Sequence, residues 1–163
     1  MTGARRILLF GGIALAIVGM CHGTWYAVFA EHQALDRIGG SLASAFTHAA
    51  DRDTASASIA LAEYRARKYV HDRQVDAHGH WIGLAMLLVA LAIVFERLSF
   101  AEKWKLLLAI GLLIGATVFS LSMVLQTFSH GSLPRALSIA SSALMIGSLA
   151  ITSFGFASGR SRS

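Results

Sequence analysis

The chain changes character within residues 77–95, which read AHGHWIGLAMLLVALAIVF. The preceding residues are rich in charged side chains, whereas this stretch contains no aspartate, glutamate, lysine or arginine. No proline separates the two parts, so the sequence predicts one long helix that begins in water and continues into a membrane. This expectation makes the fold class that of an integral membrane protein.

The composition of the whole chain supports the same class. Hydrophobic residues make up 55% of the 163 residues and charged residues 14%, with a mean hydropathy of +0.61. Soluble domains carry roughly a quarter charged residues. The net charge of +5 is small and no basic block is present, so no nucleic-acid partner is expected. The one cysteine, Cys21, excludes a disulfide within the chain and any metal site of the CxxC type.

Four apolar segments in the chain predict transmembrane helices. We place these helices at about 7–29, 80–96, 105–128 and 136–157. The first segment follows Arg5-Arg6 and resembles a signal peptide, yet we expect it to be retained as the first transmembrane helix. The sequence thus predicts an all-α integral membrane protein, a four-transmembrane-helix bundle that forms a single membrane domain.

Residues 31–80, between the first two membrane helices, read as a helical hairpin outside the membrane. Apolar residues recur at helical spacing on both arms: Leu35, Ile38, Leu42, Phe46 and Ala49, then Ile59, Ala62, Ala66 and Tyr69. Asp51-Arg52-Asp53-Thr54 is the expected turn, and Asp53 or Thr54 would cap the second arm. Gly39-Gly40 would bend the first arm or allow a close crossing. A long hairpin is therefore expected to protrude between helices 1 and 2.

Small residues recur about one helical turn apart in three of the predicted membrane helices. They are Gly12, Ala16, Gly19 and Gly23 in the first, Gly111 and Gly115 in the third, and Ser138, Ser142, Gly147 and Ser148 in the fourth. In lipid, such stripes let two helices approach closely. We expect these stripes to be packing surfaces.

The basic residues predict the orientation of the chain. With both termini inside, the short inner segments hold Arg5, Arg6, Arg97, Lys103, Lys105, Arg160 and Arg162. The short outer loop before the fourth helix holds Arg135 alone. Because short cytoplasmic loops carry an excess of lysine and arginine, both termini are expected to be cytoplasmic. In a bacterium this places the chain in the inner membrane with its hairpin in the periplasm.

On this topology all seven histidines fall in the outer half, and His22 lies within the first predicted membrane helix. An ionisable group inside a membrane is a functional-site hypothesis by default. The helical rise places His22 and His80 each roughly 6 Å below the outer surface, on adjacent antiparallel helices. Two such imidazoles can hold a b-type haem, or a copper or zinc ion. For His22, an interhelical hydrogen bond is the alternative interpretation.

Four further residues are candidates to complete this site. His130 and Gln126 lie one turn apart at the end of the third helix, and Asp76 can orient an imidazole through its carboxylate. His78 is two residues from His80, which turns the two side chains about 200° apart on a helix. We therefore expect His80 to face the bundle as a ligand, and His78 to lie on the hairpin face and to assist at most.

The sequence contains no motif of nucleotide binding, metalloprotease activity or serine hydrolysis, so no catalytic residue is proposed. Two hypotheses remain for a binding protein or subunit of this kind. The first is a small redox or metal protein that serves electron transfer or a larger oxidoreductase, with a periplasmic redox partner. The second is an accessory subunit whose hairpin docks a partner, packed in lipid against other membrane subunits or further copies of itself. A sensor is a third, weaker reading, because no output domain is visible.

A basic cluster on the second hairpin arm has two interpretations of its own. Its members are Arg65, Arg67, Lys68 and Arg73. Such charges usually form a solvated helix face, and docking to an acidic partner is the more specific alternative.

Overall fold

The structure is a computed structural model that describes residues 1–129 and 131–159. In chain order its elements are α1 (Gly3–Trp25), a π-helix η1 (Tyr26–Ala30), α2 (Glu31–Ala50), α3 (Thr54–Val94), a 3-10 turn η2 (Phe95–Arg97), α4 (Glu102–Phe128) and α5 (Ser132–Gly159). The described residues form helices and no strands, which confirms the predicted all-helical fold. His130 and the basic residues Arg160 and Arg162 lie outside the described residues.

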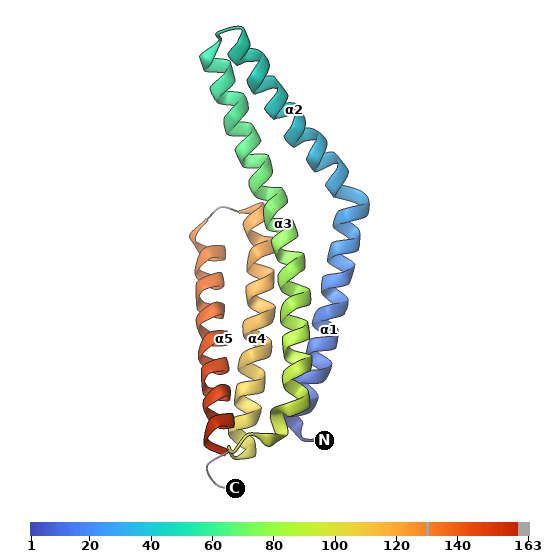
Figure 1. Cartoon of the computed structure of the whole chain (residues 1–163), viewed down its shortest axis with the longest axis vertical. Coiled ribbons are helices and arrows are strands. Elements are labelled where there is room, and N and C mark those ends of the chain that lie inside the picture. Colours follow the sequence, from blue (N-terminus) through green and yellow to red (C-terminus); the bar gives the residue numbers. More distant parts are fainter. Residues whose placement is uncertain (130, 160–163) are drawn as a thin grey trace.

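Four helical stretches are long and apolar enough to cross a membrane, as the sequence predicted. They are Gly3–Ala50, Thr54–Arg97, Glu102–Phe128 and Ser132–Ser158. Figure 1 shows α1, α3, α4 and α5 side by side, with the start of α1 and the end of α5 at the same end. From the other end, α2 and the first half of α3 extend well beyond α4 and α5 as a helical hairpin.

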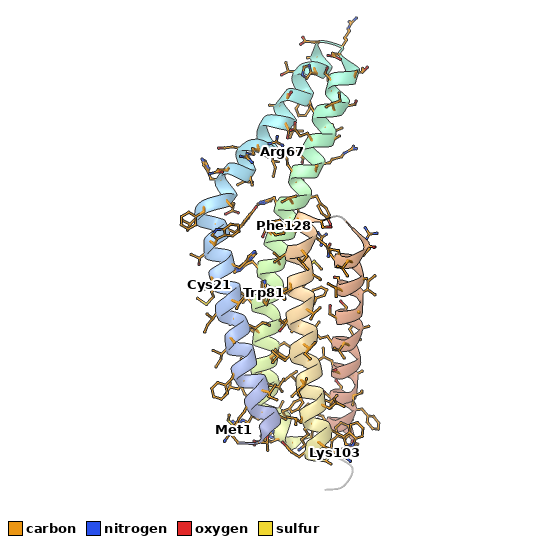
Figure 2. All side chains as sticks on the ribbon, turned by 180° about the vertical axis from the view of Figure 1, so that it is seen from behind. Met1, Cys21, Arg67, Trp81, Lys103 and Phe128 are labelled. Carbon is orange, nitrogen blue, oxygen red and sulfur yellow. The ribbon has the colours of Figure 1, made fainter. Side chains whose placement is uncertain are left out.

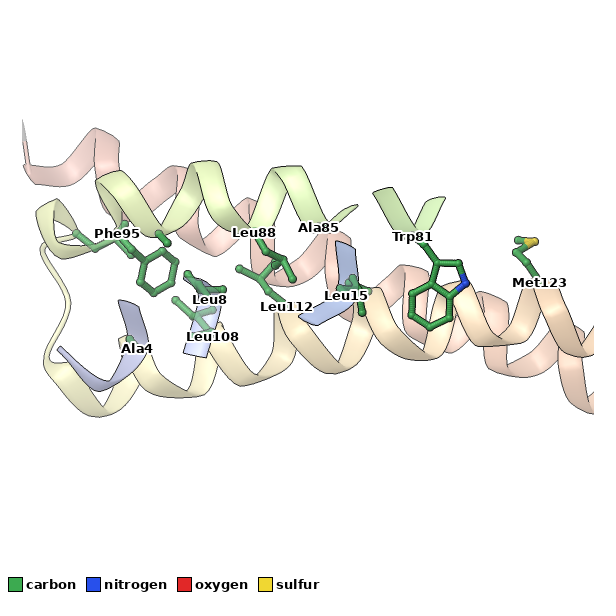
Figure 3. Close-up of a cluster of buried hydrophobic side chains, with 14 of the residues drawn as sticks. Ala4, Leu8, Leu15, Trp81, Ala85, Leu88, Phe95, Leu108, Leu112 and Met123 are labelled. Carbon is green, nitrogen blue, oxygen red and sulfur yellow. The ribbon is translucent and has the colours of Figure 1, made fainter. Parts of the chain in front are cut away.

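The bundle has a three-helix core with a fourth helix attached. α3 packs against α1, α2 and α4, and α4 also packs against α1, whereas the main neighbour of α5 is α4. Figure 3 shows the apolar core between α1, α3 and α4, where Leu8, Leu88, Leu112 and Phe95 are almost fully buried. At the end that leads to the hairpin, this core contains Trp81 and, beyond it, Met123 of α4.

Buried and half-buried residues recur along one side of α3 at alternating steps of four and three. They form a continuous interface, which we call the α3 seam. The positions, all buried or half-buried, are Ala60, Tyr64, Arg67, His71, Gln74, His78, Trp81, Ala85, Leu88, Ala92 and Phe95. A period of 3.5 residues is that of a left-handed coiled coil. The seam is polar from Tyr64 to His78 and apolar from Trp81 onward, so the chemistry of this continuous interface changes where the bundle meets the hairpin.

The hairpin turn agrees with the prediction, but the packing of its arms does not. Arg52 adopts a left-handed conformation with φ 59°, and the Asp53 carboxylate accepts a 3.1 Å hydrogen bond from the Ser56 backbone N–H. The predicted apolar stripe is wrong in part, because Phe46 and Ile59 are each 69% exposed and Leu35 is 49% exposed.

Small residues fill the hairpin interface in place of those apolar side chains. Ser41 and Ala45 of α2 and Ala60 of α3 are buried there. The arms follow the 3.5-residue seam, and a stripe drawn at 3.6 residues drifts away from it over several turns.

The bend in the first long helix lies at η1 and not at the predicted Gly39-Gly40. α2 is α-helical through both glycines, and no neighbouring atom lies within 4 Å of a Cβ built on either. A π-turn adds one residue to a helix and is a recognised cause of bending. After this insertion, Ala34, Ile38 and Ser41 continue the half-buried or buried face of the chain toward α3.

The glycine stripe of α1 packs against α3 as predicted. A Cβ on Gly19 would lie 2.6 Å from Trp81 Cβ, and one on Gly12 would lie 3.0 Å from the Ala85 carbonyl oxygen. A Cβ on Gly23 would overlap the His78 ring. The two helices are therefore in direct contact along most of the bundle.

The stripe between α4 and α5 is confirmed on α4 and corrected on α5. Gly111 and Gly115 face Ser148 and Met145 of α5. On α5, however, Gly147 is exposed, and Ser142 is only half-buried. The buried polar residues of this helix are Ser138, Ser141, Ser148 and Thr152, whose steps of three, seven and four again follow the 3.5-residue period.

Candidate functional site at the junction of bundle and hairpin

A chain of hydrogen bonds links three helices where the bundle meets the hairpin. His22 Nε2 of α1 lies 2.8 Å from Gln74 Oε1 of α3. The Gln74 amide nitrogen donates to Thr127 Oγ1 of α4 at 3.3 Å, and the Thr127 hydroxyl donates to the Val124 carbonyl at 2.7 Å. Gln74 is only 7% exposed, so this chain crosses the interior of the protein.

The direction of this chain assigns the tautomer of His22. Because an amide oxygen only accepts, the Nε2 of His22 carries the hydrogen, and a neutral imidazole then holds its lone pair on Nδ1. His22 Nδ1 is buried and has no hydrogen-bond partner among the described residues. The ring therefore offers one unused acceptor nitrogen, which is the form in which histidine binds a metal ion.

Two further histidines of the α3 seam meet α1 on the same side. His71 Nδ1 lies 2.7 Å from the Tyr26 hydroxyl, and His78 Nδ1 lies 3.0 Å from the Gly19 carbonyl oxygen. On α3, positions 71, 74 and 78 follow steps of three and four, which brings them to one face. This face meets positions 19 and 22 of α1 and position 26, the first residue of η1.

His80, expected to face the bundle opposite His22, meets α4 instead of α1, and His78 is the histidine that contacts α1. His80 Nδ1 lies 2.6 Å from the Asp76 carbonyl oxygen of its own helix, and its ring meets the edge of Phe119 of α4 with centroids 4.9 Å apart. The expected 200° separation of the two histidines holds, but the seam gives the α1 side to His78. His22 and His80 thus have different neighbours, and the interface joins His22 with Gln74 and brings His78 against the adjacent Gly23.

The residues expected to assist have other contacts in the structure. The Asp76 carboxylate lies 3.4 Å from Arg73, and the Tyr69 hydroxyl donates to Gln126 Oε1 at 3.3 Å. Thr127, the residue after Gln126, is the one that reaches the His22 chain. His130 lies outside the described residues.

The sequence analysis did not identify Gln74, Thr127 and Tyr26 as residues of the site at the junction. A signal for Gln74 was present, because it lies three residues after His71 and four before His78 and so shares their helix face. Thr127 and Tyr26 carried no such signal, since their partners lie on other helices.

Three buried side-chain polar atoms have no hydrogen-bond partner among the described residues, and one of them belongs to His22. These atoms are His22 Nδ1, Arg73 Nε and Ser120 Oγ. Arg73 reaches α4, where its guanidinium lies 3.4 Å from Met123 Sδ, and Met123 lies three residues after Ser120. Buried polar groups normally have a partner, and an ion or ligand is one reason for an exception.

The described residues contain no group of three or more histidine, cysteine, aspartate or glutamate side chains that could hold a metal ion. Two exposed pairs lie on the hairpin, His32 with Asp36 at 3.5 Å and His48 with Asp53 at 3.8 Å. An ion held at the junction would therefore have at most two such ligands from the described residues.

No protein-family model, curated protein or solved structure matches this chain. The functional argument accordingly rests on the geometry of the junction.

Proposed function

We propose that the chain is a multi-pass membrane protein of the bacterial inner membrane that holds a copper or zinc ion at its periplasmic end. His22 and His78 are the ligands from this chain. The observation that carries the proposal is the set of contacts made by the ring nitrogens of the junction histidines, from which their tautomers are assigned. Metal-binding histidines commonly donate their other ring N–H to a carbonyl or carboxylate oxygen, and this contact directs the lone pair to the metal.

The junction repeats that pattern at three imidazoles. His22 donates through Nε2 to an amide oxygen, whereas His78 and His80 contact backbone carbonyl oxygens through Nδ1. The lone pairs are thereby held on His22 Nδ1, His78 Nε2 and His80 Nε2. Of these, His22 and His78 belong to the same α1–α3 interface, which is why we choose them as the pair.

Close packing favours an ion over a haem at this interface. α1 and α3 touch through Gly12, Gly19 and Gly23, so a flat macrocycle would have to separate helices that are in direct contact. A single ion with ligand distances near 2 Å needs no such separation.

A site with two histidine ligands leaves coordination positions open. Imidazole suits copper and zinc, and a partner protein can supply the missing ligand. The proposed role is to deliver or hold the ion for a larger membrane oxidoreductase, or to transfer electrons to a periplasmic redox partner. Both roles fit a subunit better than a stand-alone enzyme.

Metal binding by the purified full-length protein tests this proposal. Equilibrium dialysis against copper or zinc should give one ion per chain. His22→Ala and His78→Ala should each weaken binding by at least about tenfold, since even outer contacts of a metal ligand change affinity by that much. His32→Ala is the matched control, because His32 lies exposed on the hairpin. Absence of binding, or equal losses in all three variants, would contradict the proposal.

The accessory-subunit function is the second candidate, and one observation favours it. The junction histidines 22, 71, 78 and 80 each have a protein partner, so their contacts suffice to hold the hairpin on the bundle without any ion. In that case His22→Ala lowers thermal stability while the wild-type protein binds no metal. Metal binding measured by dialysis and the thermal stability of His22→Ala together therefore separate the two functions.

A further inference from the structure

A second site lies on the hairpin, immediately beyond the bend at η1. A cavity of about 310 Å³ opens here between the two arms. Its lining residues are Ala34 and Arg37 of α2 and Ala66, Arg67, Val70 and His71 of α3. The walls are largely apolar, and the polar groups come from two arginines and one histidine.

The cavity follows from the local geometry of the chain. η1 bends the first long helix outward before α2 returns toward α3 (Figure 1). At the same level the α3 seam carries the long side chain of Arg67 where a small residue would allow direct contact. Figure 2 shows Arg67 on the hairpin, beyond the end of the bundle that Phe128 marks.

The charges around the cavity suit an anion. Arg37 has no ion pair or side-chain hydrogen bond among the described residues. Arg67 pairs with Glu63 on its own helix, but a guanidinium has five N–H donors and one such contact leaves others available. Two arginines against one glutamate leave a net positive charge. Guanidinium groups bind phosphate oxygens in a bidentate manner.

The level of the cavity indicates which anion is available. The Tyr69 hydroxyl donates to Gln126, two residues before α4 ends at Phe128, so this part of α3 lies beside the end of the apolar bundle. In a bilayer that covers the four apolar helices, lipid headgroups lie at this level. The apolar walls formed by Ala34, Ala66 and Val70 suit the glycerol and upper acyl carbons of a lipid.

We propose that this cavity binds the phosphate group of an anionic phospholipid, with Arg37 and Arg67 as its ligands. The site borders the junction at His71, but it uses neither His22 nor His78 and does not depend on the metal proposal. Bound lipid fills the space between the arms at the bend and fixes the angle at which the hairpin leaves the membrane.

Binding of phosphatidylglycerol to the full-length protein in detergent micelles tests this assignment. Dioleoylglycerol, which lacks the phosphate, is the comparison lipid. Arg37→Gln/Arg67→Gln should weaken phosphatidylglycerol binding by about tenfold or more, the effect of losing charge-assisted contacts. Arg65→Gln/Arg135→Gln removes the same two charges from exposed positions and should change binding less than about threefold. Arg37→Gln alone, at an exposed position, gives the same direction if the double variant folds poorly.

The competing outcomes are distinct. Displacement of the lipid by inorganic phosphate would support the phosphate as the recognised group. Equal losses in both double variants would show a general surface-charge effect and overturn the proposal. Binding of dioleoylglycerol as tight as that of phosphatidylglycerol would also overturn it. Inorganic phosphate that binds in an arginine-dependent way, without any binding of phosphatidylglycerol, would replace the lipid by a soluble phosphate ester.

Discussion

His22 Nε2 of α1 lies 2.8 Å from Gln74 Oε1 of α3, and Gln74 in turn donates to Thr127 of α4. One buried amide thus connects the three helices of the core at the level where the hairpin begins. Because a glutamine side chain both accepts and donates, the same residue determines the tautomer of His22 and the position of α4. The junction is therefore a structural connection as well as the candidate site.

Replacement of Gln74 by alanine should destabilise the protein by about 1–3 kcal/mol, the effect of leaving a buried donor unsatisfied. The donor in question is the N–H of His22. Gln33→Ala, at an exposed position of α2, is the control and should leave stability unchanged. Unfolding in mixed micelles of increasing SDS fraction measures both. Equal stability of the two variants would exclude the hydrogen-bond chain.

Because α1 directly contacts α3, the stability of the protein should depend strongly on the glycines of α1. Gly19→Ala places a Cβ 2.6 Å from Trp81 Cβ, so the helices must move apart, at a cost of about 1–3 kcal/mol. Gly83→Ala in α3 has no atom within 4 Å of the new Cβ and should be neutral or slightly stabilising. The same SDS unfolding experiment compares them. A Gly83→Ala protein that is as unstable as Gly19→Ala would contradict the observed packing.

The stability of the first turn of α3 should depend on pH through Asp53. Hydrogen bonds from Ser56 hold the pKa of Asp53 below its ordinary value of 3.8. A lowered folded-state pKa means that the carboxylate stabilises the helix start above pH 3.8 and loses this contribution as the pH falls through the folded value. Hydrogen exchange of the first α3 amides, corrected for intrinsic rates, should show less protection at low pH. In Asp53→Ala this change should be absent, and a similar change in the variant would exclude the cap as its cause.

The predicted orientation can be measured in intact cells. In a Cys21→Ala background, a membrane-impermeant maleimide should label Thr47→Cys near the hairpin tip before lysis, because the hairpin is expected to be periplasmic. Lys103→Cys, in the exposed first turn of α4 after η2, should react only after lysis. The reverse labelling pattern would place the termini outside and overturn the assignment of the site to the periplasmic end.

The features that the sequence could predict are those with local causes. The 41-residue α3 contains no proline, its start is capped by Asp53, and it is apolar from Trp81 onward, so its length followed from the residues themselves. The spacing of Gly12, Gly19 and Gly23 predicted a surface for close helix packing, and the structure identifies α3 as the helix that packs there.

The face of the candidate site depended on information that is not local. A period of 3.5 rather than 3.6 residues, kept over the seam from Ala60 to Phe95, gives the α1 side to His78 and turns His80 toward Phe119. The π-turn at η1 had no recognised sequence signal, and it moved the bend away from Gly39-Gly40. Which residues form hydrogen bonds across the junction, such as Gln74 with Thr127, depends on the distances between helices.

Imidazole nitrogen-15 chemical shifts of His22 give the most direct test of the central claim, that His22 keeps Nε2 for Gln74 and Nδ1 for a metal ion. In the metal-free protein, Nε2 should carry the hydrogen and Nδ1 should not. One equivalent of zinc should shift the Nδ1 signal and leave the Nε2–H in place. A hydrogen on Nδ1, or two signals that zinc leaves unchanged, would contradict the account.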